Sequence, residues 1–418
     1  MAELADALDS KSSGLRAVRV RFPPSAPHRS KSGAASPRHD DFDQFRLRHE
    51  PFGADAGYAG IGGGWRPTLS STRVRIGVLT GGGDCPGLNA VIRAVARRSL
   101  DRGHEVIGVR EGWKGLVESV FSPLGDREIS GILPRGGTII GTTRTNPYRL
   151  DGGVDRVLEN FRRERLDALV AIGGEDTLGV ASRLHAEHEL PVVGVPKTID
   201  NDLAATDYTF GFDTAVAIAT EAIDRLHTTA ESHNRVMVVE VMGRDTGWIA
   251  VMSGIAGGAD VILIPEQPIT VETACAEIDR RHRRGKDFSI VVVSEGYELN
   301  YGSGERPAVA QEDVDQFGHV RRGGVGAEVA REIEERTGFE TRVTVLGHVQ
   351  RGGSPTPRDR VLATRYGLKA ADLVDEAKWG RMAALHGDRI VDVALAEATA
   401  ELKTVPAEWY DVAQAFFG

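Results

Sequence analysis

Short apolar runs that end in glycine or in charged residues recur from Arg73 onward, and they limit the possible folds more than any other feature of the chain. Residues 74–79 form the first run, three glycines follow it, and residues 90–100 then place apolar side chains at helical spacing. This order of strand, glycine loop and helix is typical of a βα unit. Its repetition predicts an α/β fold.

The later apolar runs predict seven more strands, separated mostly by helical patterns. They cover residues 106–109, 168–172, 192–195, 236–241, 261–264, 289–293 and 343–346. Six of the runs end in polar or glycine-rich loops, at residues 81–84, 173–177, 196–202, 242–245, 294–296 and 347–353. Open α/β sheets bind ligands at the carboxyl ends of their strands. We therefore expect the chemistry at one edge of a parallel sheet, or of two facing sheets.

The loop at residues 196–202, Pro-Lys-Thr-Ile-Asp-Asn-Asp, is the most crowded with functional groups. Its carboxylates, Asp200 and Asp202, are spaced to serve as one general base and one residue that orients the base or assists a metal ion. An Asx-type turn would explain the same residues without any chemistry, because Asp and Asn favour turns. The residues alone leave both interpretations open.

Two other loops suit a phosphorylated ligand, and each also has a purely structural interpretation. Gly81–Gly83 could present backbone N–H groups to a phosphate at a helix start, but it matches neither a Walker A loop nor a dinucleotide fingerprint, and a tight turn explains it equally well. Glu175 could bind Mg²⁺ through one carboxylate, or it could simply begin a helix.

Four arginines stand at strand starts or ends, where their guanidinium groups could hold a sugar phosphate or could be solvated. They are Arg235, Arg244, Arg342 and Arg351.

Charge and cysteine content exclude several classes of protein. The 418 residues include 51 Lys and Arg against 60 Asp and Glu, a net charge of −9, which argues against binding nucleic acid or an anionic membrane. Cys85 and Cys275 are too far apart for a zinc knuckle or a disulfide framework, which fits a reducing cytoplasm. No apolar run approaches the roughly 20 residues of a membrane span, and the first residues lack a signal core. We expect a cytoplasmic protein.

Residues 1–72 differ from the rest of the chain. They are rich in Ser, Pro, Gly and Arg and show no lasting helical or strand period. We expect this segment to be disordered, or to be an extension that results from a start codon assigned too early.

The polar loops together resemble the 6-phosphofructokinase family, from about Arg73 to about Arg360. The matching stretches are GGGDCPGLN at 81–89, GGTIIGTTR at 136–144, GGEDT at 173–177, PKTIDND at 196–202, MGR at 242–244, SEG at 294–296 and GHVQRGG at 347–353. The resemblance implies Mg²⁺-dependent phosphoryl transfer to the 1-hydroxyl of fructose 6-phosphate, in glycolysis or gluconeogenesis. It also implies two facing Rossmann-like α/β domains with the active site in the cleft.

The resemblance assigns a role to each matching residue. Asp200 matches the catalytic base, Thr198 and Asp202 support the sugar and the metal, and Arg244 matches the residue that steadies the transferring phosphoryl group. The sugar-binding set is Thr198, Ile199, Asp200, Arg235, Met242, Gly243, Arg244, Glu295, Arg342, His348 and Arg351. The donor-binding set is Gly82, Gly83, Arg144, Asp176, Thr177 and Lys197, with Glu175 as the metal ligand and Lys197 also in the catalytic set.

Two positions point to pyrophosphate as the donor. ATP-using members carry Gly where this chain has Asp176, and many bacterial ATP-using members carry Gly where it has Lys197. This combination is similar to the pyrophosphate-dependent branch, which acts reversibly. Asp176 is the discriminating residue, since some ATP-using relatives also carry the lysine. An ATP-dependent phosphofructokinase is one alternative, and a non-catalytic regulatory subunit that binds sugar phosphate is another.

The resemblance also implies a domain division and an oligomer. We expect a donor-binding domain at residues 73–210 plus about 351–398, and a sugar-phosphate-binding domain at 211–350 plus about 399–418. In bacterial members the arginines that match Arg235 and Arg342 reach a neighbouring subunit's site. A homodimer or a homotetramer is therefore expected.

Overall fold

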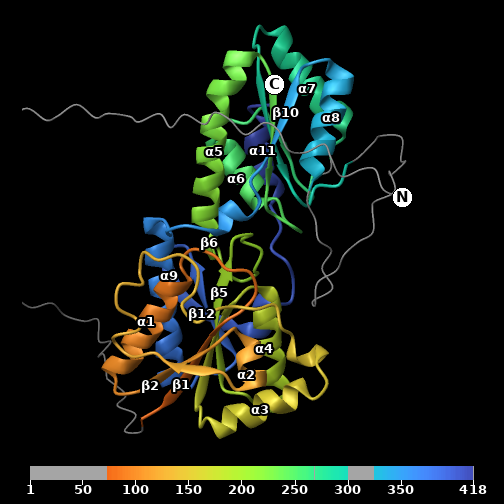
Figure 1. Ribbon diagram of the computed structural model, residues 1–418. Coiled ribbons are helices and arrows are strands. Elements are labelled where there is room, and N and C mark those ends of the chain that lie inside the picture. The colour runs from red at the N-terminus through yellow and green to blue at the C-terminus, as the bar shows by residue number, and fades with distance from the viewer. Residues whose placement is uncertain (1–72, 268, 300–323, 418) are drawn as a thin grey trace, which may run out of the picture. The chain divides into compact units, whose positions relative to one another are not determined.

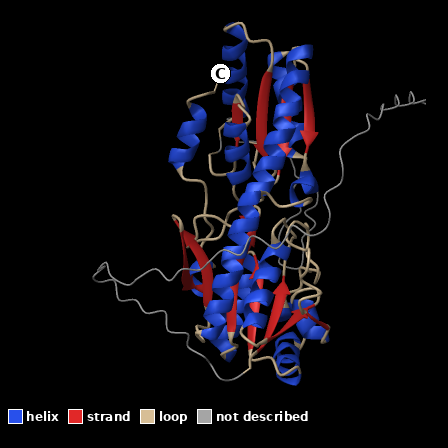
Figure 2. Cartoon of the chain, turned by 90° about the vertical axis from the view of Figure 1, so that its left-hand side faces the viewer, coloured by secondary structure: helices blue, strands red, loops and turns tan. Residues whose placement is uncertain are grey.

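Two β-sheets flanked by helices organise the chain in the computed structural model (Figures 1 and 2). The structure describes residues 73–267, 269–299 and 324–417, all of which belong to the unit Thr68–Gly418. The expectation for residues 1–72 lies outside the described residues. Within the described part, no helix has both the length and the apolar character that a membrane crossing requires.

The first sheet has a parallel centre and antiparallel edges, in the order β12-β11-β5-β4-β1-β2-β3, with β6 pairing with β5. Its strands are β1 (Arg75–Thr80), β2 (Glu105–Val109), β3 (Phe121–Pro123), β4 (Ala168–Gly173), β5 (Val192–Thr198), β6 (Phe210–Gly211), β11 (Arg381–His386) and β12 (Arg389–Ala394). The central strands β4 and β5 are buried along their whole length. Continuous burial is expected of parallel strands that are covered on both faces.

The second sheet is parallel throughout, in the order β10-β7-β9-β8. Its strands are β7 (Val236–Val241), β8 (Val261–Leu263), β9 (Ser289–Ser294) and β10 (Thr341–Val345). Every residue of β7, β8 and β9 is buried, whereas β10 lies at the edge and leaves Val343 and Val345 exposed. The predicted fold class, α/β with parallel sheets, is confirmed.

Helices follow the strands along the chain. Apart from α5 (Phe212–His233), which follows β6, the helices that follow strands of the first sheet or join its parts are α1 (Leu88–Asp101), α2 (Trp113–Glu118), α3 (Gly153–Arg163), α4 (Glu175–His188), α9 (Pro357–Asp375) and α10 (Leu395–Ala398), with the 3₁₀ helix η1 (Pro147–Arg149). The others are α5, α6 (Trp248–Ala256), α7 (Val271–Arg283), α8 (Val325–Thr337) and α11 (Ala407–Gln414), with the 3₁₀ helix η2 (Gly347–Arg351).

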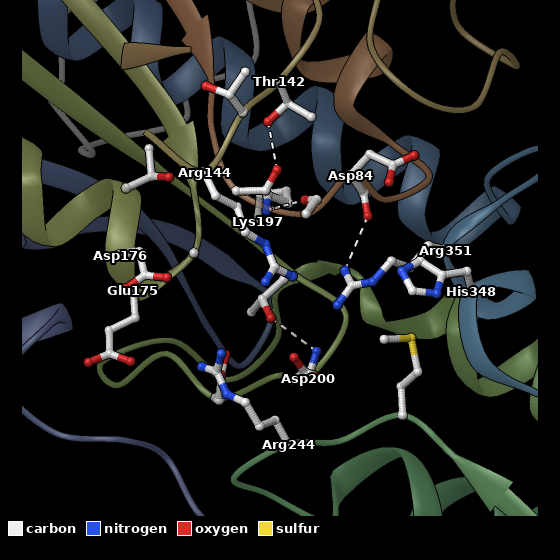
Figure 3. Close-up of a pocket in the computed structure, with 18 of the residues that line it drawn as sticks. Asp84, Thr142, Arg144, Glu175, Asp176, Lys197, Asp200, Arg244, His348 and Arg351 are labelled. Atoms are coloured by element: carbon white, nitrogen blue, oxygen red, sulfur yellow. Dashed lines mark hydrogen bonds between the residues drawn. The ribbon is translucent and has the colours of Figure 1, made fainter. Parts of the chain in front are cut away.

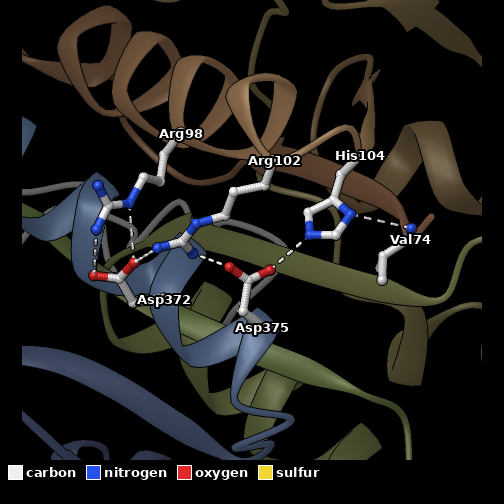
Figure 4. Close-up of polar contacts among 6 residues, drawn as sticks. All are labelled: Val74, Arg98, Arg102, His104, Asp372 and Asp375. Carbon is white, nitrogen blue, oxygen red and sulfur yellow. Dashed lines mark hydrogen bonds and ion pairs between the residues drawn. The ribbon is translucent and has the colours of Figure 1, made fainter. Parts of the chain in front are cut away.

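A polar network joins the carboxyl ends of α1 and α9 on the first sheet (Figure 4). Arg98 of α1 and Arg102, the C-cap of that helix, both bind Asp372, at 3.0 and 2.6 Å, and Arg102 also pairs with Asp375. Nδ1 of His104 accepts the N–H of Val74, so its Nε2 carries the proton and donates to Asp375 at 2.7 Å. Burial and the nearby Arg102 lower the pKa of His104, which favours this neutral form. The network fixes α9 against the start of the sheet.

Asp359, in the first turn of α9, ties this helix to the start of α5. Its Oδ2 accepts the backbone N–H of Thr214 at 2.8 Å and the Thr214 hydroxyl at 2.5 Å, and the carboxyl is completely buried. Removing a buried acceptor leaves its donors unsatisfied, at about 1–3 kcal/mol per group. We predict that Asp359→Ala lowers the free energy of unfolding in urea by about 2–4 kcal/mol.

Asp388→Ala, at an exposed turn, is the matched control and should change the free energy of unfolding by less than about 0.5 kcal/mol. Equal stabilities of the two variants would contradict a structural role for Asp359.

The carboxyl-terminal segment passes from the first sheet to the second. After α10, Leu402 forms an antiparallel bridge with Leu203, and the N–H of Lys403 donates to the carbonyl of Asp202 at 2.8 Å. Helix α11 then contacts α6, and Tyr410 donates its hydroxyl hydrogen to the carbonyl of Ile262. One segment therefore touches a loop at the end of β5 and the helices of the second sheet.

Candidate active site

Loops at the carboxyl ends of strands in both sheets line one pocket of about 740 Å³ (Figure 3). This volume lies in the range of small-molecule sites. The lining residues are Gly82, Gly83, Asp84, Thr142, Thr143, Arg144, Gly174, Glu175, Asp176, Thr177, Lys197, Thr198, Asp200, Asp202, Met242, Arg244, Glu295, His348 and Arg351.

The glycine loop after β1 needs its glycines for close approach. A Cβ at Gly81 would lie 2.4 Å from Oγ1 of Thr177, and Gly82 has a φ of 77°, which L side chains rarely adopt. The loop is held by Thr142, whose hydroxyl donates to the carbonyl of Gly82 at 2.6 Å. Backbone therefore reaches the pocket wall with no side chain in the way.

Two cations bind the same loop from opposite parts of the chain. Lys197, at the end of β5, donates from Nζ to the carbonyl of Gly83 at 2.5 Å, and Arg351, from η2, donates to the carbonyl of Asp84 at 3.3 Å. Lys197 is only 4 % exposed, and this burial lowers its pKa. Both positive charges lie beside the glycine loop, where they can attract an anionic ligand.

Helix α4 begins at the pocket with two acidic residues. Gly174 is its N-cap, and Glu175 and Asp176 form the first turn, where negative side chains interact favourably with the helix dipole. All three residues line the pocket, and Figure 3 draws both carboxyl groups on the same side of it. A carboxyl group at Asp176 thus takes part of the space in which a ligand would lie.

The loop after β5 holds Asp200 through its backbone. The hydroxyl oxygen of Thr198 accepts the N–H of Asp200 at 3.0 Å, and the Thr246 hydroxyl donates to its carbonyl at 3.2 Å. Asn201 has a φ of 52°, and its side chain accepts the N–H of Thr209 at 3.0 Å. The Oδ1 atoms of Asp200 and Asp202 are buried without a hydrogen-bond partner among the described residues. Buried carboxylate oxygens of this kind are suited to a proton, a metal ion or a ligand hydroxyl.

Two carboxyl groups of this region have raised pKa values. Burial, and then the charge of Asp200, raise the pKa of Asp202 to about 7 and that of Glu295 to about 7. Perturbed groups that share a cleft are typical of functional sites, although ion networks can also produce them.

Glu295 predicts a measurable dependence of stability on pH. Its folded-state pKa lies above the ordinary value of 4.5, so its contribution is fully present below about pH 4.5 and is lost as the pH rises through about 7. At 1.36 kcal/mol per pKa unit the effect is at most about 3 kcal/mol. We predict that Glu295→Gln and the wild type unfold with similar free energies at pH 5, and that the variant is more stable by about 2–3 kcal/mol at pH 8.

Urea unfolding at both pH values tests this, with the exposed Glu397→Gln of α10 as the control. A difference between wild type and Glu295→Gln that does not grow with pH relative to the control would contradict the prediction.

Hydrogen bonds join the loops that follow β7, β9 and β10 to one another beside the pocket. The carbonyl of Gly243 accepts the Ser294 hydroxyl at 2.6 Å and the N–H of Gly296 at 3.0 Å. The side chain of the buried Gln350 accepts the N–H of Met242 at 3.3 Å. These contacts fix the loop that carries Arg244, whose Nε pairs with Asp245 at 2.6 Å.

Four of the predicted site residues do not line this pocket. Ile199 is completely buried in the core, and Gly243 lies behind the wall with its contacts to Ser294 and Gly296. Arg235 precedes β7 and Arg342 is in the first half of β10, at the opposite ends of these strands from the pocket, and both bind Glu340. A role for these two arginines in a neighbouring subunit's site stays a prediction.

The structure adds residues that the sequence did not single out. Asp84, Thr142, Thr143 and Gly174 line the pocket, and Gln350 supports it. The first four lie inside glycine-rich loops of the recognised motifs, so their position in these loops could have predicted that they line the pocket. Gln350 lies in the GHVQRGG stretch at 347–353, but its contact could not be predicted from that stretch, because it depends on the approach of Met242 from another strand.

The pocket combines the groups needed to bind an anion and to move a proton. Cationic side chains from both sheets, Lys197, Arg244 and Arg351, line it together with the carboxyl groups of Asp200 and Glu175. Within the described ranges, no cluster of three or more His, Cys, Asp or Glu residues could hold a metal ion by itself. Mg²⁺ sites beside phosphates usually take one or two carboxylates from the protein and their other ligands from phosphate oxygens and water.

Comparison with known proteins assigns these motifs to one family. The family model described as Phosphofructokinase matches residues 75–374. The chain is 58 % identical over 347 residues to a pyrophosphate--fructose 6-phosphate 1-phosphotransferase of Amycolatopsis mediterranei, a match that covers 82 % of this chain and 100 % of the relative. It is 52 % identical over 342 residues to ATP-dependent 6-phosphofructokinase 3 of Streptomyces coelicolor, covering 82 % and 99 %.

A solved structure agrees with this assignment. The phosphofructokinase of Saccharomyces cerevisiae superposes with a TM-score of 0.66 at 33 % sequence identity. The match covers 78 % of this chain and 45 % of the yeast chain, so this chain spans less than half the length of that relative.

Proposed function

The chain belongs to the phosphofructokinase family, and from this we propose that it transfers a phosphoryl group from pyrophosphate to the 1-hydroxyl of fructose 6-phosphate. The products are fructose 1,6-bisphosphate and phosphate, and the reaction is reversible. The observation that carries the proposal is one pocket in which Asp200, with its unpartnered Oδ1, lies among Lys197, Arg244 and Arg351. A base among cations is what phosphoryl transfer to a hydroxyl needs.

Asp200 is the proposed base. Its carboxylate takes the proton of the sugar 1-hydroxyl as that oxygen forms a bond to the terminal phosphorus of the donor and the bridging P–O bond breaks. The released phosphate takes the electrons of that bond. The backbone contacts of Asp200 with Thr198 and Thr246 support this role, because a base must be held at a fixed distance from the hydroxyl.

Positive side chains stabilise the charge on the transferring and leaving groups. Arg244 is proposed to steady the transferring phosphoryl, and Lys197 to face the leaving phosphate beside the glycine loop. Gly82, Gly83, Arg144, Asp176 and Thr177 complete the proposed donor side. Thr198, Met242, Glu295, His348 and Arg351 are the proposed sugar contacts.

Magnesium fits the acidic part of the pocket. Glu175 is the proposed ligand. Asp202 supports the fit, because its buried Oδ1 has no hydrogen-bond partner among the described residues. The charge of Glu175 contributes to the raised pKa of Asp202, so the two carboxyl groups lie near enough to interact. When bound, Mg²⁺ would neutralise charge on the phosphate oxygens of the donor. The protein holds the carboxyl groups of Glu175 and Asp202 on separate loops, both of which line the pocket.

Pyrophosphate is the proposed donor because of Asp176. Its carboxyl group lines the pocket at the start of α4, where its negative charge would repel a further phosphate group such as the α-phosphate of ATP. The 58 % identical relative is named for pyrophosphate, which supports the choice. ATP as donor is the second candidate, favoured by the 52 % identical relative named for ATP.

The parts of the chain that form the two sheets are proposed to bind different substrates. We propose that the first sheet, with residues 73–210 and about 351–398, binds the donor, and that residues 211–350 with about 399–418 bind the sugar phosphate. The exposed edge strand β10, which carries Arg342, supports a homodimer or homotetramer in which Arg235 and Arg342 reach a neighbouring site.

Product analysis tests the proposed reaction. The purified protein is incubated with fructose 6-phosphate, Mg²⁺ and pyrophosphate, and fructose 1,6-bisphosphate is followed by phosphorus NMR. The reverse reaction starts from the bisphosphate and phosphate. We expect product in both directions, and none without Mg²⁺. Failure to form the bisphosphate from either pyrophosphate or ATP would overturn the proposed function, whereas product from ATP alone would overturn only the donor.

A further inference from the structure

Lys403, in the segment between α10 and α11, binds the loop that follows Asp200. Its ammonium donates to the side-chain Oδ1 of Asn201 at 3.0 Å and to the carbonyls of Thr206 and Asp207, both at 2.9 Å. Its backbone N–H donates to the carbonyl of Asp202 at 2.8 Å. The three N–H bonds of a lysine ammonium are thus matched by three oxygens of one loop.

The same residue also binds the loop that follows Arg244. The carbonyl of Lys403 accepts the indole N–H of Trp248 at 2.9 Å, and its ammonium lies 5.6 Å from the centre of that ring. Trp248 is 8 % exposed and begins α6, four residues after Arg244.

A carboxylate strengthens this second attachment. Glu266 accepts the N–H of Gly247 at 3.0 Å and the N–H of Val405 at 3.0 Å. Glu266 therefore joins Gly247, which precedes Trp248, to Val405, which lies two residues after Lys403.

We propose that Lys403 is a positioning residue that clips the Asp200–Asp207 loop of the first sheet to the Arg244–Trp248 loop of the second, and so sets the separation of Asp200 and Arg244. The inference rests on the proposed function, which gives these two residues their roles. Lys403 does not line the pocket, so it acts through the loops and does not touch substrate.

The contacts of Lys403 favour an effect on catalysis, and not only on the packing of the two loops. Asn201, which Lys403 grips, lies between Asp200 and Asp202 and has the left-handed φ of 52°. Thr246 donates to the carbonyl of Asp200 from the loop on the other side. A shift of the clip therefore moves the base and the phosphoryl-stabilising arginine relative to each other, and a misplacement of about 1 Å can lower a rate about 10²-fold.

Lys403→Met tests the clip, because it keeps the length of the side chain and removes the charge and the three donors. We expect kcat to fall about 10²-fold while KM for fructose 6-phosphate and for the phosphoryl donor changes less than about threefold. Lys378→Met is the matched control, since Lys378 is an exposed lysine paired with Glu376 at 2.8 Å, and it should keep wild-type kcat.

Chemical rescue separates positioning from damage to the fold. Lys403→Cys should lose kcat in the same way, and alkylation with 2-bromoethylamine, which rebuilds a lysine-like ammonium, should restore at least about a third of it. Alkylation with iodoacetamide, which adds a neutral group, should not. Cys85 and Cys275 are buried, and wild type treated with each reagent serves as the reference.

Trp248→Phe tests the other end of the clip if the Lys403 variants do not fold. It keeps one aromatic ring and removes the indole N–H donor together with the five-membered ring, and we expect a loss of roughly tenfold in kcat with little change in KM.

The outcomes separate the two proposals. Wild-type kcat in folded Lys403→Met, or in Trp248→Phe where the lysine variants do not fold, would overturn the positioning role while leaving the proposed reaction intact. A wild type that converts fructose 6-phosphate with neither pyrophosphate nor ATP would overturn both.

Discussion

Asp200→Asn is expected to lower kcat by at least about 10²-fold in both directions while fructose 6-phosphate still binds. The asparagine side chain keeps the shape of the aspartate but cannot accept the proton of the sugar hydroxyl, and general-base catalysis contributes about 10² to 10⁴ in rate. The backbone contacts with Thr198 and Thr246 do not involve the carboxyl group, so the loop should keep its conformation. Steady-state kinetics and calorimetric titration with the sugar phosphate measure the two effects separately.

Asp388→Asn is the matched control. Asp388 lies at an exposed turn outside the pocket. This variant should therefore keep wild-type kcat. If Asp200→Asn turns over within a few-fold of the wild type, Asp200 is not the base.

Asp176→Gly is expected to make ATP an effective donor. Two unit charges about 4 Å apart at an effective dielectric near 20 repel by about 4 kcal/mol, which is about a thousandfold in affinity. Screening by solvent reduces this figure, because Asp176 is only half-buried. The glycine removes both the charge and the volume of the side chain from the pocket wall, so we expect kcat/KM for ATP to rise by about 10²- to 10³-fold.

Two further variants separate the effect of the charge of Asp176 on ATP use from the effect of its volume and from a general effect of removing an acidic residue at a helix start. Asp176→Asn removes the charge and keeps the volume, so an intermediate gain with ATP is expected. Asp155→Gly makes the same change in the first turn of α3, outside the pocket, and controls for the loss of an acidic residue at a helix start. If neither Asp176 variant gains activity with ATP, Asp176 does not exclude the nucleotide.

Most strands could be predicted because burial on both faces makes a parallel strand a continuous apolar run. The predicted strands at residues 168–172, 236–241 and 289–293 match β4, β7 and β9 to within one residue at each end. The edge strand β10 was predicted to start two residues too late and to end one residue too late, because its first residues, Thr341 and Arg342, are polar. The two-residue β6 is too short to give any pattern.

The hairpin of β11 and β12 was missed. No strand was predicted after residue 346, and the first α-helix of that part of the chain is α9, Pro357–Asp375. The hairpin follows, and β11 pairs with β5. Its turn at Gly387-Asp388 is a dipeptide typical of tight hairpins, so a signal was present. The alternation in β12 is weak, because most of its residues are half-buried.

The site was predictable as a set of loops but not as a set of contacts. The rule that strand ends meet at one edge of a sheet places Arg244 and Glu295 together after β7 and β9. Lys197 ends β5 of the other sheet, and the resemblance to the family, with its two facing domains, was needed to predict that it lines the same pocket. The grip of Lys403 on Asn201 joins residues about two hundred positions apart, and no local pattern indicates it. Such a contact is fixed only when the carboxyl-terminal segment has packed between the two sheets' loops.

The most direct test of the proposed reaction is the ratio of kcat/KM for pyrophosphate to kcat/KM for ATP, measured on the wild-type protein with saturating fructose 6-phosphate and Mg²⁺. The charge and volume of Asp176 predict a ratio of at least about 10² in favour of pyrophosphate. A ratio of one or less would contradict pyrophosphate as the donor.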